Sequence, residues 1–160
     1  MDIHRSSENH SDPSIAPRVE SPDLSPADQS SERLQVNILY TTPSGTRAAL
    51  TIASRLSADL RTCSEVLRVY AVPYSLPLER PAVPIGFLEE QVRALARQSP
   101  AEITARIILC REPRAILRQV FPPHSVIVIA GKKRWWPTKE QRWAGILKQE
   151  GHEVIFVDGD

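Results

Sequence analysis

Ser125-Val126-Ile127-Val128-Ile129-Ala130 is the stretch that decides the fold class of this 160-residue chain. The run is almost wholly apolar, whereas a strand with one face in water alternates apolar and polar side chains. It therefore predicts a strand that is covered on both faces, as in the parallel sheets of α/β proteins.

Four other apolar runs repeat this signal, and segments with apolar residues at spacings of three and four separate them. Strands are predicted at residues 36–41, 65–72, 103–110, 125–130 and 153–157. Helices are predicted at about 49–60, 88–95, 113–121 and 138–151, the last with a capping box of Thr138 and Gln141. Five strands alternating with four helices predict a doubly wound α/β fold, a mostly parallel five-stranded sheet with helices on both faces.

The first 33 residues differ in composition from the rest of the chain. They carry seven acidic and three basic residues, eight serines, four prolines and no aromatic residue. Such a segment buries too little apolar surface to offset the entropy of ordering it. We predict a disordered, acidic, Ser/Pro-rich tail at residues 1–33 and one α/β domain at residues 34–160.

Composition also excludes several classes of protein. The chain has 20 Lys and Arg residues and 19 Asp and Glu residues, and this nearly even balance does not indicate a polyanionic partner. No apolar run reaches the ~20 residues of a membrane span, and the first residues lack the apolar segment of a secretory signal, so a cytoplasmic location is expected. Cys63 and Cys110 are expected to be small hydrophobes near the core, and no metal site is predicted.

Three stretches of the chain resemble the universal stress protein family. Residues 38–40 and 46–50 are similar to its first strand and helix start, and Cys110-Arg111-Glu112-Pro113 is similar to its G-x-P turn after the third strand. Residues 125–157 are similar to its last strand–helix–strand unit. The resemblance covers residues 35–158 and implies the strand order 3-2-1-4-5, counted along the chain.

Many members of that family bind ATP through an aspartate that ends the first strand and a G-x2-G-x9-G-[S/T] loop after the fourth. Thr41 stands at the aspartate position, and only Gly131 of the loop is kept. Arg134 replaces the second glycine, where a side chain blocks close approach of the backbone to phosphate. No tight ATP binding is expected, but an atypical adenine-nucleotide site remains open, built from Thr41, Ser44, Gly131 and Arg134.

The segment Lys132-Lys133-Arg134-Trp135-Trp136-Pro137 is the most unusual stretch of the chain. In one interpretation, the two tryptophans cover the edge of the sheet while the charges stay in solvent. In another, Lys132, Lys133, Trp135 and Trp136 bind a partner or an anionic surface. Single-stranded nucleic acid would use the same stacking and charge, but no other segment extends the basic track, so nucleic acid is not an expected partner.

Groups suited to catalysis are scarce. His4 and His10 fall in the predicted tail, and His124 and His152 precede strands, at the end of the sheet away from a ligand. No pair of residues has metal-ligand spacing on one helix. We therefore expect no enzymatic activity.

The fifth predicted strand ends the domain and lies at one edge of the proposed sheet. Its apolar residues do not alternate with polar ones, and no later helix covers that edge. We expect a homodimer joined at this edge through Val154, Phe156 and Val157. The alternative is a monomer whose edge is shielded by the tail or by Trp135 and Trp136. Together these features indicate a non-enzymatic interaction or regulatory module of the stress-response type.

Overall fold

A computed structural model describes residues 18–20 and 35–159 of the chain. Its strands form one parallel sheet in the order β1-β4-β3-β2-β5-β6. The strands are β1 (Arg18–Glu20), β2 (Val36–Leu39), β3 (Ser64–Ala71), β4 (Ile103–Cys110), β5 (Val126–Gly131) and β6 (Glu153–Asp158). The helices are α1 (Pro43–Leu60), α2 (Ile85–Ala96), α3 (Pro113–Leu117) and α4 (Lys139–Gln149).

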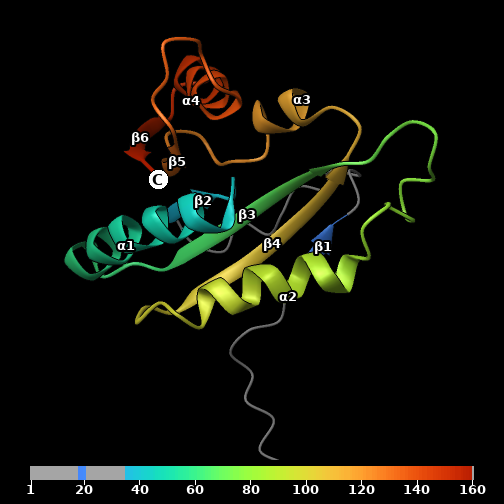
Figure 1. The fold of residues 1–160 in the computed structure, drawn as a ribbon. Helices are drawn as coiled ribbons and strands as arrows, with labels where there is room; N and C mark the ends of the chain where they lie inside the picture. The colour runs from blue at the N-terminus through green and yellow to red at the C-terminus, as the bar shows by residue number, and fades with distance from the viewer. Residues whose placement is uncertain (1–17, 21–34, 160) are drawn as a thin grey trace, which may run out of the picture.

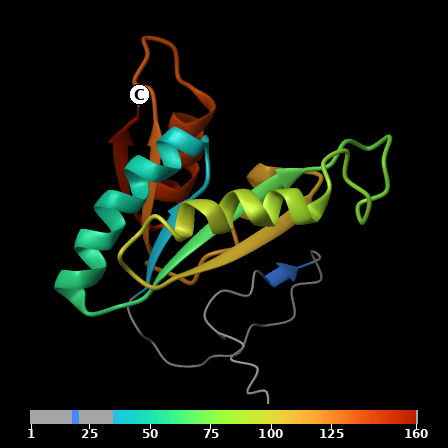
Figure 2. The same ribbon diagram turned by 60° about the horizontal axis from the view of Figure 1, so that its bottom comes forward.

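The predicted topology is confirmed. Without β1, the strands follow the expected order 3-2-1-4-5. Helices α1 and α2 pack on one face of the sheet and α3 and α4 on the other (Figure 1; Figure 2). In the central strand β2, Leu39 is paired with Leu67 on one side and Ile129 on the other, and all three are fully buried. The apolar runs are therefore core strands, as their lack of alternation indicated.

Local signals fix the ends of the helices. Helix α1 begins where Thr42 Oγ1 accepts the backbone N–H of Gly45 at 3.1 Å, with Pro43 in the first turn. The capping box of α4 is confirmed, since Thr138 and Gln141 each bond to the other's backbone.

Helix α3 is shorter than predicted. Its apolar stripe is buried, including Val120 and Phe121, but the helix ends at Leu117 and a turn follows. Pro122 and Pro123 disfavour helical backbone just before them, so the last predicted turn is lost.

The sheet has a sixth strand that the sequence did not indicate. Arg18–Glu20 lies within the predicted tail and forms β1, with Arg18 in register with Arg106 of β4. The rest of the predicted tail lies outside the described residues.

The prediction for Cys63 is wrong. Its side chain is exposed, because it lies in the short turn between α1 and β3, where the backbone pairs with Val36 and the side chain faces solvent. Cys110, at the end of β4, is buried in the core on the α3 and α4 side, as predicted.

Candidate ligand pocket at the carboxyl edge of the sheet

A recess of about 300 Å³ lies at the carboxyl edge of the sheet. It forms because β2 ends at Leu39, opposite Leu67, while β3 continues to Ala71 beside β4. In doubly wound sheets this edge is where ligands bind. The walls come from the segment that follows β2, from β3 and from α4: Tyr40, Thr41, Arg68, Val69, Tyr70, Ala71, Lys139, Glu140 and Trp143.

Arg68 provides a fixed positive charge on the β3 wall. Its guanidinium carbon lies 4.2 Å from the centre of the Tyr40 ring, and Nη1 donates to Gln91 Oε1 at 2.6 Å and to the Leu88 carbonyl at 3.3 Å. Burial lowers the pKa of Arg68, against an opposing effect of the neighbouring tyrosines. A guanidinium nevertheless keeps its proton in proteins, so this wall is cationic at physiological pH.

The opposite wall is the first turn of α4. Lys139 places Nζ 4.3 Å from the centre of the Trp143 ring, and Trp143 is 5% exposed. Glu140 packs tightly on the end of β5, because a Cβ added to Gly131 would lie 2.6 Å from the Glu140 Cβ. The pocket thus holds two cations, one carboxylate and three aromatic rings.

The predicted nucleotide residues are only partly brought together. Thr41 lines the pocket, and its Oγ1 donates to the Ala130 carbonyl at 2.9 Å, next to Gly131. Ser44 lies in the first turn of α1, and neither Ser44 nor Gly131 lines the recess. Arg134 is exposed in the β5–α4 loop and makes no hydrogen bond or ion pair with those three residues within the described ranges.

The chain itself fills the space between the start of α1 and the end of β5. Gly159 is buried and donates its N–H to the Gly131 carbonyl at 3.3 Å. A Cβ on Gly159 would lie 3.2 Å from the Gly45 Cα, and a Cβ on Gly45 would lie 2.9 Å from Thr41 Oγ1. The backbone amides that a phosphate would approach are therefore packed against other residues.

The sequence did not indicate that Arg68, Lys139, Tyr40, Tyr70 and Trp143 would share a site. The available signal was the charge of Arg68 inside a predicted buried strand, a feature that Arg106 shares in another strand. The recess depends on β2 being four residues long and β3 eight. Periodicity does not fix such a difference between strands.

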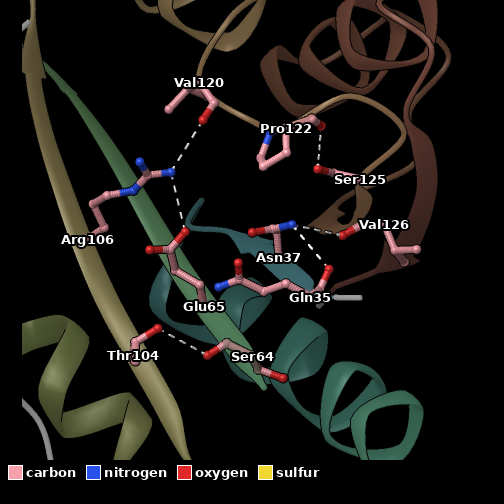
Figure 3. Close-up of polar contacts among 10 residues, drawn as sticks. All are labelled: Gln35, Asn37, Ser64, Glu65, Thr104, Arg106, Val120, Pro122, Ser125 and Val126. Carbon is pink, nitrogen blue, oxygen red and sulfur yellow. Dashed lines mark hydrogen bonds and ion pairs between the residues drawn. The ribbon is translucent and has the colours of Figure 1, made fainter. Parts of the chain in front are cut away.

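The opposite end of the sheet carries a row of polar side chains on its α3 face (Figure 3). Arg106 Nη2 lies 3.3 Å from Glu65 Oε2, and each side chain is 17% exposed. Arg106 also donates to the Val120 carbonyl, and Asn37 Nδ2 donates to the carbonyls of Gln35 and Val126. These contacts tie the starts of the strands to the segment after α3, so we assign the row a structural role.

The two described histidines lie at this same end, away from the pocket, as the sequence indicated. His152 is buried, its Nδ1 accepts the Ser125 N–H at 3.3 Å, and its ring centre lies 5.9 Å from that of Phe121. Burial lowers the pKa of His152, with Glu150 opposing the effect and His124 adding to it. Neither histidine can reach a ligand at the carboxyl edge.

The tryptophans of the β5–α4 loop do not cover the sheet edge, so that interpretation is wrong. Trp135 is 94% and Trp136 79% exposed. The neighbouring Lys132, Lys133 and Arg134 are also exposed. Figure 2 shows this orange loop projecting beyond the ends of β5 and β6.

A second recess, of about 320 Å³, lies between α1 and the segment that follows α2. Its lining includes the aliphatic side chains of Leu50, Ala58 and Leu95 and the cationic side chains of Arg47 and Arg55. No residue of the described strands lines it, so it is separate from the recess at the carboxyl edge of the sheet.

Two kinds of site and segment are missing from the part of the chain that the structure describes. No three His, Cys, Asp or Glu side chains are placed there to hold a metal ion. No helix there has the length and apolar character needed to cross a membrane.

Comparison with known proteins gives matches in structure alone. No family model matches the sequence, and a search of curated protein sequences finds no match. The universal stress protein of Archaeoglobus fulgidus superposes with a TM-score of 0.56 at 15% identity, covering 77% of this chain and 92% of that one. A universal stress protein solved in complex with cAMP gives a TM-score of 0.51 at 14% identity, covering 81% of this chain and 100% of that one. With its strand order, these matches show that the chain has the fold of the universal stress proteins.

Proposed function

We propose that this protein is a non-enzymatic, cytoplasmic regulatory module of the stress-response type that binds no ATP tightly and acts as a homodimer. The observation that carries the proposal is the packing at the carboxyl ends of β2 and β5. Gly131 is in close contact with Glu140, and Gly159 with Gly45. The core of the fold is intact, but the backbone that would face a phosphate is packed against other residues. Such a domain is suited to contacts with other proteins.

Several features act against a triphosphate. The first N–H groups of α1 point toward this end of the sheet, but Thr42 already accepts that of Gly45. Arg134 follows Lys132 and Lys133 in the β5–α4 loop and is exposed there. Glu140 adds a carboxylate beside Gly131, where a phosphate would carry the same sign of charge.

Isothermal titration calorimetry with ATP and Mg²⁺ tests this proposal. We expect no binding in the micromolar range. The matched variant is Glu140→Gln, which removes the carboxylate but keeps the shape of the side chain. Micromolar binding of ATP by the parent protein would contradict the proposal, whatever the variant does.

A second candidate function is the binding of a small adenine nucleotide in the pocket, with an atypical set of residues. The pocket itself favours it, because Arg68 and Lys139 place positive charge in the walls of a recess of about 300 Å³ that aromatic side chains also line. One protein with the same fold was solved with cAMP. A ligand with one phosphate would need neither the backbone at Gly131 nor the space filled by Gly159.

Titration with cAMP and AMP separates the two candidates. Binding that is lost in Lys139→Ala but kept in Lys148→Ala, an exposed lysine near the other end of α4, would support the nucleotide pocket. If the titrations show neither binding heat nor saturation with cAMP or AMP, the proposed nucleotide-binding role of the pocket is contradicted.

A further inference from the structure

The β5–α4 loop, Lys132–Pro137, presents the two most exposed large apolar side chains among the described residues. Trp135 is 94% and Trp136 79% exposed, whereas Trp143, five residues into α4, is 5% exposed. Tryptophan has an apolar body and a polar N–H, and it is enriched where one side of an interface is apolar and the other is wet. Two such side chains in water on adjacent residues point to a partner surface.

The charged residues within the loop itself are all cations. Lys132, Lys133 and Arg134 precede the two tryptophans and are exposed. Within the described residues none of the three forms an ion pair. At the start of the loop, Asp158 Oδ1 accepts the backbone N–H of Lys133 at 3.4 Å, a contact that does not involve the Lys133 ammonium group. The cations are therefore available to an anionic surface.

Both ends of the loop are fixed, so the tryptophans are held away from the core. At the start, Gly131 is packed between Glu140 and Phe156, whose atoms lie within 3.3 Å of the place of its missing Cβ. At the end, Pro137 leads into the capping box of Thr138 and Gln141. The loop thus projects beyond the strand ends without any rearrangement of the fold (Figure 2), and both tryptophan side chains are exposed on it.

The shape of the loop decides between two anionic partners. Proteins that stack single-stranded nucleic acid on aromatic rings use a positively charged groove that follows the backbone. Here the cations and rings share one short projection, and neither recess of the described structure is lined by them. At a bilayer surface, tryptophan lies at the level of the headgroups and Lys and Arg bind anionic lipids.

We propose that the Lys132–Trp136 loop docks this protein on the surface of anionic lipid bilayers, with Trp135 and Trp136 at headgroup level and Lys132, Lys133 and Arg134 on the lipid charges. This contact goes beyond the proposed regulatory function and does not depend on nucleotide binding. It is peripheral and reversible, because one short loop supplies it.

Vesicle binding by the full chain tests the proposal. Vesicles of phosphatidylcholine alone are compared with vesicles that also contain phosphatidylserine, by co-sedimentation and by tryptophan emission. We expect binding to the mixed vesicles only, a blue shift of emission, and weaker binding as salt rises. Failure to bind the mixed vesicles at low salt would overturn the proposal.

Two variants and two matched controls assign the contact to the loop. Trp135→Ala/Trp136→Ala should abolish binding, whereas Tyr74→Ala/Phe87→Ala, which removes two other exposed aromatics, should not. Lys132→Gln/Lys133→Gln/Arg134→Gln should lower partitioning roughly a hundredfold. Removing three other exposed cations, Arg55, Arg80 and Arg114, by the same substitution should have far less effect. In the double tryptophan variant, emission from buried Trp143 and a thermal melt report whether the fold is intact.

Two other results would each overturn the proposal. Salt-dependent binding of a single-stranded oligonucleotide without vesicle binding would assign the loop to nucleic acid. A smaller assembly of Trp135→Ala/Trp136→Ala in sedimentation, again without vesicle binding by the parent, would place the tryptophans between copies of the chain.

Discussion

A single buried ring couples the stability of the fold to pH. His152 accepts the Ser125 N–H through Nδ1, and burial holds its pKa below the ordinary value of about 6.5. Just below pH 6.5, His152 therefore binds a proton in the unfolded chain and stays neutral in the folded chain. The free energy of unfolding should be at its full value above about pH 6.5 and should fall as pH drops below that value.

Urea unfolding near neutral pH and at about pH 5.5 measures this effect. His152→Gln should lessen the loss of stability between the two conditions, because glutamine does not titrate there. His124→Asn, at a φ of 57° that asparagine tolerates, should keep most of the pH dependence, because burial is the largest cause of the lowered pKa of His152. An unchanged pH dependence in His152→Gln would contradict this role.

The two cysteines should differ in reactivity, because the thiolate is the reactive form. Burial raises the pKa of the Cys110 thiol to about 11, and the side chain is 2% exposed. Cys63 is exposed. A disulfide reagent should modify one thiol quickly in the native protein and the second only after denaturation. In Cys63→Ser the fast phase should vanish, and equal rates for both thiols in the parent would argue against the buried position of Cys110.

At the scale of the elements, the strand that decided the fold class should also dominate stability. Ile127 of β5 is fully buried in the core formed with α3 and α4. Ile127→Ala should lower the free energy of unfolding by about 2–5 kcal/mol. Val126→Ala, at a partly exposed position on the same strand, should cost less. If denaturant titrations show a larger loss of stability for Val126→Ala than for Ile127→Ala, the buried position of Ile127 is contradicted.

Much of the fold could be predicted from sequence because its signals are local. The apolar strand β5 and the Thr138–Gln141 capping box can each be recognised from a few consecutive residues. The strand β1 does not, because a three-residue segment has no periodicity of its own and pairs with the edge that β4 offers. Cys63 was misplaced for a related reason: its exposure depends on how the turn between α1 and β3 points its side chain.

The candidate site was harder to predict than the fold. The family resemblance indicated a site at Gly131 and Arg134. The pocket instead forms beside Arg68 and Lys139, because β2 is shorter than β3. Those two residues are far apart in sequence, and only the sheet order and the position of α4 bring them to one recess. The filling of the neighbouring space by Gly159 is likewise a property of the folded chain.

At the scale of the whole molecule, the described sheet has two edge strands, the three-residue β1 and the six-residue β6. Val154 and Phe156 pack toward α4, and Ile155 and Val157 toward α1, so both sets are half-buried. The N–H groups of Glu153 and Gly159 point inward, to the carbonyls of Ser125 and Gly131. By alternation, those of Val154 and Phe156 face outward and are available to another strand. Trp135 and Trp136 are exposed and do not shield the β6 edge, which removes one of the two shields of the monomeric alternative.

The last prediction is that this edge joins two copies of the chain around a two-fold axis, with Phe156 or Val157 near the axis. Val157→Lys places a charge at that edge, where pairing would bury it, and should shift the sedimentation equilibrium of the protein from dimer toward monomer. Phe87→Lys adds the same charge at an exposed apolar residue of α2 and should leave the dimer intact. Circular dichroism melts of both variants separate loss of pairing from loss of the fold. A parent protein that stays monomeric at tens of micromolar would exclude the dimer.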